Sequence, residues 1–195
     1  MIIGITGGTG CGKTTALRAL EELGFHIIDC DALYHTLLET DQEMLQAIEN
    51  CFPGVLLNGK LQRKVLGQKV FSNETALNQL NQTVWPFVYR AVEAQIVEKK
   101  PQSCAIDAIG LLESGLGNLC DLTVAITAPT EDRISRLMAR EGISKDYACL
   151  RIQAQKPNDV FAAQCSVTIE NTFGSADSFQ AHCKTQFQQI LKEDV

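Results

Sequence analysis

Apolar and amphipathic segments alternate along this chain. Short apolar runs at residues 1–6, 26–29, 103–107, 122–127 and 166–170 predict buried strands. The first run leads through a glycine-rich loop into residues 14–23, where apolar side chains recur at helical spacing and Gly24 follows the last of them. A strand, a loop, a helix and a second strand in this order predict the start of a parallel α/β sheet.

A helix-rich block separates the second predicted strand from the third. Residues 32–71 are mostly helical by pattern, with turns at Pro53-Gly54 and Asn58-Gly59. Asn-Gly can also close a two-residue β-hairpin, and the short flanking runs leave both interpretations open. Residues 74–99 predict a long helix that Pro86 starts or kinks. Further helices are expected at residues 131–140, 144–155 and 175–191.

Composition narrows the class of protein. The chain has 195 residues, of which 45% are hydrophobic and 21% charged, and its net charge is −6. These values fit one globular domain and exclude a disordered, collagenous or coiled-coil chain, and the negative charge argues against a broad nucleic-acid-binding face. The chain has eight cysteines, each at least 16 residues from the next, so no C-x-x-C pair is present. No signal peptide or membrane-spanning run is recognisable. We therefore expect a cytoplasmic protein with reduced thiols.

Residues 7–14 (GGTGCGKT) match the pattern G-x-x-x-x-G-K-[ST]. Glycines allow successive backbone N–H groups to approach phosphate oxygens, and the helix that follows favours anions at its N-terminus. Lys13 can reach the β- and γ-phosphates, and the Thr14 hydroxyl can ligate Mg²⁺. A glycine-rich turn with a chance lysine is the alternative, but the strand before the loop and the helix after it favour phosphate binding. The predicted ATP-binding residues of the loop are Gly8, Thr9, Gly10, Cys11, Gly12, Lys13, Thr14 and Thr15.

Several classes of enzyme share such a loop. A GTPase needs an N-K-x-D motif after a later strand, which this sequence lacks, although residues 107–110 (DAIG) match a short switch-like pattern. A motor ATPase is usually longer or oligomeric, so the length and the helical block favour a small kinase. Inside the loop, Cys11 is either a small loop residue or, at the start of a helix, a thiol of lowered pKa.

Carboxylates follow two of the predicted strands, and the carboxyl ends of parallel strands face the ligand. Asp31 can accept a proton from a substrate hydroxyl or orient a Mg²⁺-bound water, but it can equally be the N-cap of the next helix. His35 lies one helical turn later and can face the same site. Asp107 suits a carboxylate that holds Mg²⁺ through water or contacts substrate, and Glu113 is a further substrate-binding candidate.

Three arginines, Arg133, Arg136 and Arg140, recur at i, i+3 and i+7 on one predicted helix. Guanidinium groups can stabilise a phosphoryl group in transfer, and a helix that carries them beside a glycine turn can act as a mobile lid. The alternative is a solvated face paired with residues such as Asp132 and Glu141. Arg140 is the strongest candidate, because it lies at the end of the helix.

Segments along nearly the whole chain resemble the dephospho-coenzyme A kinase family. The likeness is carried by residues 4–14 (GITGGTGCGKT), 23–25, 28–31 with His35, 66–71 (LGQKVF) and 113–116, and it continues through residues 136–142 (RLMAREG), Arg151, Gln155, Pro157 and 169–171. The phosphate loop is common to many families, whereas the D-x-D…H and R-L-x-x-R-x-G segments together narrow the resemblance to this one.

The resemblance implies a three-layer α/β/α parallel sheet of the P-loop NTPase type. Residues 1–31, 100–130 and 160–195 would form its core, residues 32–99 an inserted helical domain that binds the acceptor, and residues 131–159 a small lid. It also implies an ATP- and Mg²⁺-dependent kinase that transfers the γ-phosphate to the 3′-hydroxyl of dephospho-coenzyme A, the last step of coenzyme A biosynthesis. In such an enzyme Asp31 is the general base, Arg140 the lid arginine, and Asn171 lies near the adenine.

The sequence also departs from the family pattern. Trp85-Pro86 stands where the family has His-Pro, and Phe161 and Cys165-Ser166 stand where it has lysine and Ala-Asp. Two alternatives therefore remain: a nucleotide-binding paralogue without catalysis, and a kinase for another nucleoside or small alcohol. The partners that we expect are the small-molecule substrates ATP and dephospho-coenzyme A, with no nucleic acid and no membrane, and we expect a monomer.

Overall fold

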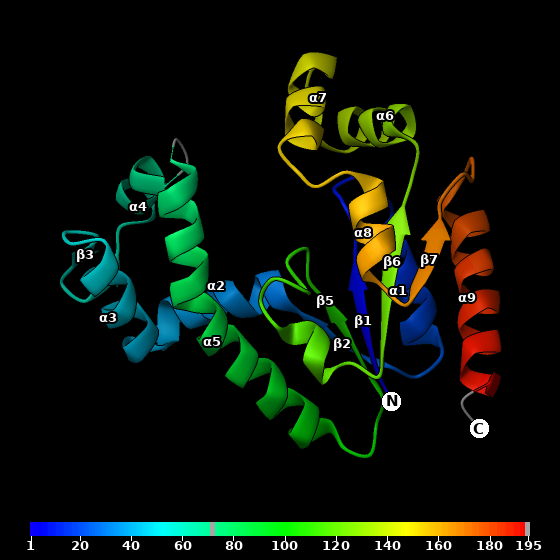
Figure 1. Cartoon of the computed structure of the whole chain (residues 1–195), viewed down its shortest axis with the longest axis horizontal. Helices are drawn as coiled ribbons and strands as arrows, with labels where there is room; N and C mark the ends of the chain where they lie inside the picture. The colour runs from blue at the N-terminus through cyan, green and yellow to red at the C-terminus, as the bar shows by residue number, and fades with distance from the viewer. Residues whose placement is uncertain (71–72, 194–195) are drawn as a thin grey trace.

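A parallel five-stranded sheet forms the centre of the molecule. The computed structural model describes residues 1–70 and 73–193. The strand order is β2 (His26–Asp29), β5 (Cys104–Asp107), β1 (Ile2–Thr6), β6 (Leu122–Thr127) and β7 (Val167–Glu170), with all neighbours parallel. Figure 1 shows that the strands point the same way, with their carboxyl ends toward the top of the view. The predicted strands are confirmed, two of them, β2 and β6, at the expected bounds.

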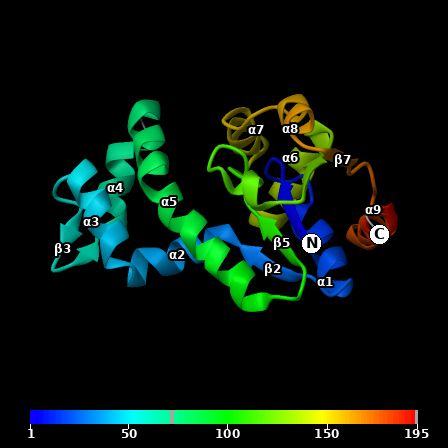
Figure 2. The same cartoon turned by 60° about the horizontal axis from the view of Figure 1, so that its bottom comes forward.

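Helices cover both faces of this sheet. On one face, α1 (Lys13–Glu22) and α9 (Ala176–Glu193) contribute apolar side chains such as Leu20 and Phe187 to a core shared with the strands. On the other face, the C-terminal half of α5 (Glu74–Lys99) and the short 3₁₀ helix η1 (Leu116–Leu119) share a second apolar cluster with the strands. The helix α8 (Asn158–Gln164) packs against β6, and Figure 2 shows α1 and α9 on one side of the strands and α5 on the other. The predicted three-layer α/β/α architecture is confirmed.

The block between β2 and β5 extends to the left of the sheet in Figure 1. It has an apolar cluster of its own, which includes Met44, Ile48 and Leu80. Its elements are α2 (Cys30–Thr40), α3 (Gln42–Cys51), β3 (Leu56–Leu57), β4 (Lys60–Leu61), α4 (Arg63–Val70) and the N-terminal half of α5. Phe71, at the end of the predicted helical stretch, lies outside the described residues.

Two ambiguous signals in this block are settled by the backbone. Asn58 and Gly59 both have positive φ angles, 51° and 74°, and join β3 to β4, so the hairpin interpretation is confirmed. Pro86 lies inside α5, which runs from Glu74 to Lys99 without a break. The expectation that Pro86 starts a helix is therefore wrong.

Two helices lie beyond the carboxyl ends of the strands (Figure 1). They are α6 (Thr130–Glu141) and α7 (Lys145–Gln153), joined at Gly142, which has a φ of 66°. A small apolar cluster, including Leu137 and Ala148, holds them together. None of the helices that the structure describes has the length and apolar character needed to cross a lipid bilayer.

Candidate active site

The glycine-rich loop connects the carboxyl end of β1 to the start of α1. A positive φ of 104° places Gly12 in a conformation that glycine adopts without strain, and a Cβ there would lie 2.5 Å from Asn171 Nδ2. Three amides of residues 8–15 are already engaged: Thr9 N–H donates to Gln155 Oε1 (2.8 Å), Cys11 N–H to Gly8 O (3.3 Å) and Thr15 N–H to Gly12 O (3.0 Å). The amides of Gly8, Gly10, Gly12, Lys13 and Thr14 donate to no other described residue.

A cavity of about 520 Å³ lies over this loop and the start of α1. Its walls combine loop backbone with cationic side chains from three different helices and two carboxylates from the sheet edge. They are formed by Gly8, Thr9, Gly10, Gly12, Lys13, Thr14, Thr15, Arg18, Asp31, Asp107, Ala108, Ile109, Arg136, Arg140 and Arg151. The cavity thus suits a polyanion.

Cys11 is the one predicted loop residue that does not line this cavity. Its side chain is fully buried in the core beneath the loop. Burial raises the pKa of the thiol, although the positive charges of Arg133 and Lys13 act in the opposite direction. The interpretation of Cys11 as a small structural loop residue is therefore confirmed, and the reactive-thiol alternative is wrong.

Lys13 and Asp107 occupy the floor of the cavity. Lys13 Nζ donates to Gly7 O (2.9 Å), and burial lowers the pKa of Lys13, while the negative charge of Asp107 raises it. Asp107 is the register partner of Ile5 on β1 and of Asp29 on β2. Burial raises the pKa of Asp107 to about 6, and Lys13 partly offsets this rise. Both groups therefore lie in a desolvated site, where the charge of each one shifts the pKa of the other.

Asp29 and Asp31 have different positions although only one residue separates them. The Asp29 carboxylate caps α2 by accepting from the N–H of Ala32 (2.9 Å). The interpretation of Asp31 as this cap is wrong, because α2 begins at Cys30 and Asp31 already lies in its first turn. The Asp31 carboxylate forms no hydrogen bond with a described residue and lines the polar cavity.

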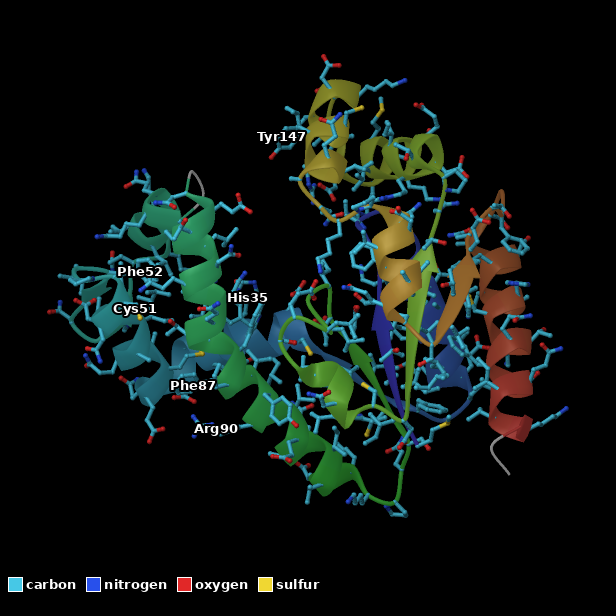
Figure 3. All side chains as sticks on the ribbon, viewed as in Figure 1. His35, Cys51, Phe52, Phe87, Arg90 and Tyr147 are labelled. Carbon is cyan, nitrogen blue, oxygen red and sulfur yellow. The ribbon has the colours of Figure 1, made fainter. Side chains whose placement is uncertain are left out.

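A second cavity, of about 420 Å³, adjoins the first and shares Asp31, Ala108 and Ile109 with it. Its wall is mostly apolar and comes from α2, α4, α5 and the loop after β5. Thr6 fixes this loop, since its hydroxyl donates to Ile109 O (2.9 Å). His35 also lines this cavity, and Figure 3 shows it in the gap between α5 and the sheet.

The three arginines of α6 are not equivalent. Arg133 is 2% exposed and packs under the loop, whereas Arg136 and Arg140 line the polar cavity. Arg136 donates to Gly10 O (3.3 Å) and lies 3.9 Å from the Asp132 carboxylate, and Arg140 binds Glu141. The expected pairs with Asp132 and Glu141 thus form, but only Arg136 and Arg140 lie at the cavity surface.

Two other predicted residues lie outside both cavity walls. Asn171 is 5% exposed, and its Nδ2 donates to Cys11 O (2.9 Å) while its Oδ1 accepts from Arg136 (3.2 Å). It therefore fixes the phosphate loop from beneath, and contact with a base stays a prediction. Glu113 forms an ion pair with Lys156, at the start of the segment that follows α7.

Sequence reasoning did not single out several residues that line the cavities. Arg18 lies one turn after Thr14 on α1, so its spacing from the loop could have indicated that it lines the polar cavity. Arg63 and Trp85 line the apolar cavity, and nothing in their local sequence reveals this position.

The two cavities place a polyanion site beside an organic-ligand site, with one carboxylate at the junction. This arrangement is suited to phosphoryl transfer to a hydroxyl.

Comparisons with known proteins agree with this geometry. The sequence profile of the dephospho-CoA kinase family matches residues 1–177. The chain is 36% identical to a dephospho-CoA kinase of Dehalococcoides mccartyi, over 87% of this chain and 88% of that protein. It is 35% identical to a dephospho-CoA kinase of Carboxydothermus hydrogenoformans, over 99% and 96% of the two chains. Among solved structures it is similar to the dephospho-CoA kinase of Campylobacter jejuni, with a TM-score of 0.69, 27% identity, and coverage of 100% and 98%.

Proposed function

The chain belongs to the dephospho-CoA kinase family, and from that membership we propose how its residues transfer the γ-phosphate of ATP to the 3′-hydroxyl of dephospho-coenzyme A. The product is coenzyme A, and neither the comparisons nor the cavities favour a paralogue without catalysis or a different acceptor. The observation that carries the assignment is the place of Asp31, which lines the polar cavity and the apolar cavity at once.

ATP is assigned to the polar cavity. The unengaged amides of the loop and the start of α1 receive the phosphate oxygens, and Lys13 neutralises charge between the β- and γ-phosphates. Arg140 and Arg151, at the wall formed by α6 and α7, close over the phosphoryl group as it moves. In the structure both arginines bind Glu141, so closure requires them to leave this carboxylate.

The same cavity has side chains that fit Mg²⁺. Thr14 is exposed in it, and Asp107 supplies a carboxylate at the adjacent strand end. Thr14 would ligate the ion and Asp107 would hold one of its waters, while bound Mg²⁺ would withdraw charge from the phosphates. The described residues contain no cluster of three potential metal-ligating side chains, which agrees with an ion that is held largely by phosphates and water.

The acceptor is assigned to the apolar cavity, which α2, α4 and α5 line within the block of residues 32–99. His35 and Arg63 supply polar contacts there, and the ribose hydroxyl lies at the junction, within reach of Asp31. Asp31 takes the hydroxyl proton as the oxygen attacks the γ-phosphorus, and the bond to the β–γ bridging oxygen breaks to release ADP. Residues 131–159 act as the lid that excludes water during this step.

Both cavities are built by a single chain, which supports a monomeric enzyme acting on small molecules. All eight cysteines are free thiols, as in proteins of a reducing compartment, which supports a cytoplasmic location.

Replacement of the proposed base tests this assignment. Asp31→Asn is expected to lower kcat by roughly a hundredfold to ten-thousandfold, the usual contribution of a general base, and to leave the affinity for ATP nearly unchanged. Asp29→Asn is the matched control, because it removes the same charge two residues away and asparagine still caps a helix. Acceptor binding can be followed by the fluorescence of Trp85, the single tryptophan, which lines the acceptor cavity. A loss of ATP affinity in place of turnover would make Asp31 a metal ligand.

A further inference from the structure

Arg133 is a buried cation directly behind the phosphate loop. It lies in the first turn of α6, and only 2% of its surface is exposed. Its Nε donates to Thr9 O (2.9 Å), and its Nη2 would lie 2.3 Å from a Cβ at Gly8. The guanidinium thus occupies space that only a glycine at position 8 leaves open.

The charge of Arg133 has no counter-charge within the described part of the chain. Its three nitrogens donate to neutral acceptors: Thr9 O, Asn158 Oδ1 (3.2 Å) and Gln155 Oε1 (3.1 Å). None of the carboxylates that the structure describes forms an ion pair with it, although every other arginine of α6 has one. An ionised group that is buried without an opposite charge is destabilising, so the fold maintains an unbalanced positive charge at this place.

We propose that the phosphate groups of the bound nucleotide are the counter-charge of Arg133, which makes it a positioning residue for the triphosphate. This inference rests on the proposed function, since it assumes that ATP occupies the polar cavity. Arg133 does not line that cavity, so it acts through electrostatic attraction across the loop and through the Thr9 peptide that it holds. Gln155 completes the arrangement, because its Oε1 accepts from both Thr9 N–H and Arg133.

The charge of Arg133 also bears on the loop lysine, as a lesser influence. Burial is the main cause that lowers the pKa of Lys13, and the charge of Arg133 acts in the same direction. The triphosphate is negative in the Michaelis complex and in the transition state alike, so attraction to Arg133 contributes to binding in both. Loss of this attraction should therefore raise KM for ATP and change kcat much less.

Two variants remove the unbalanced charge in opposite ways. Arg133→Gln deletes the cation, whereas Gln155→Glu leaves it in place and puts a carboxylate oxygen where the 3.1 Å contact now lies. Gln155→Glu keeps the size of the side chain and an acceptor for Thr9 N–H, so it preserves the scaffold. Gln153→Glu makes the same charge change at an exposed position on α7 and serves as the control.

The readout is calorimetric titration of the full chain with ATP, ADP and AMP. Both variants are expected to weaken ATP binding by about tenfold, to weaken ADP binding less, and to alter AMP binding little, because the effect follows the number of phosphate charges. The free Gln155→Glu protein should unfold at the same temperature as the native chain or a higher one. Gln153→Glu should leave all three affinities near those of the native chain.

Equal losses for all three nucleotides, or unchanged ATP affinity in Gln155→Glu, would overturn the proposal and leave Arg133 as scaffold alone. If Arg133→Gln fails to fold, Gln155→Glu decides by the same criteria. Assays of the native chain distinguish a failure of this proposal from a failure of the proposed function. If the native chain does not bind ATP or phosphorylate dephospho-coenzyme A, the proposed function itself fails. If it does both and the variants match it, only the role of Arg133 is lost.

Discussion

Asp107 shows how a single buried carboxylate couples stability to pH. Its folded pKa of about 6 lies above the ordinary value of 3.8, mainly because of burial. At a pH between these two pKa values, the Asp107 carboxyl is mostly protonated in the folded state and mostly ionised in the unfolded state. The contribution of Asp107 to stability is therefore fully present at low pH and is lost as the pH rises through about 6.

Asp107→Asn should remove this pH dependence. In the protein without nucleotide or Mg²⁺, the free energy of unfolding of the variant relative to the native chain should rise by on the order of 2 kcal/mol between about pH 4 and pH 8. Denaturant unfolding at several pH values measures this difference. A difference that stays constant with pH would show that Asp107 ionises normally in the folded protein.

The sequence identifies the chemistry of the site more reliably than the surroundings of each side chain. The loop pattern and the strand-end carboxylates placed Lys13 and Asp107 in one cavity, because parallel strands end at one edge. The burial of Arg133 was not predictable from its spacing on α6. It depends on contacts with Thr9, which lies 124 residues earlier in the chain.

At the scale of elements, α6 and α7 carry the arginines of the proposed lid and also the carboxylate that binds them. Glu141 binds Arg140 and Arg151, and the hydrogen bond from Arg140 is the main cause that lowers the pKa of Glu141. Since both arginines line the polar cavity, Glu141 would compete for them with the phosphates of the proposed nucleotide.

Glu141→Gln should therefore lower KM for ATP by about two- to fivefold, a factor typical of exposed ion pairs such as the two that Glu141 forms. Steady-state kinetics over a range of ATP concentrations measures the change. Glu131→Gln is the control, because Glu131 lies on the same helix, pairs with Lys145, and does not line the cavity. Equal KM values for the two variants would contradict a competition between Glu141 and phosphate.

The elements themselves were largely predictable, because hydrophobic periodicity is a local signal. The strand at 122–127 and the helix at 74–99 have the expected bounds, and the Asn58-Gly59 turn closes a hairpin. The short helices α8 and η1 were not predicted, since seven and four residues are too few to show a period. The strand order was not predicted either, because pairing of β1 with β5 joins segments about 100 residues apart.

At the scale of the whole molecule, that strand order creates the active site. With β5 between β1 and β2, the phosphate loop, Asp107 and the start of α2 meet at one edge of the sheet. The sheet edge, α6 and α7 form the polar cavity, α2, α4 and α5 form much of the apolar cavity, and Asp31 lines both. With ATP and the acceptor assigned to these cavities as proposed above, catalysis by this chain depends on the two cavities being filled together.

The most direct test is product analysis with the purified chain, Mg²⁺, ATP and dephospho-coenzyme A. We predict one ADP formed for each acceptor consumed, a product with one added phosphate on the ribose 3′-hydroxyl by mass spectrometry and NMR, and little ADP when the acceptor is omitted. Lys13→Ala should abolish both products. ADP released at the same rate with and without acceptor, or an acceptor recovered without phosphate, would contradict the account.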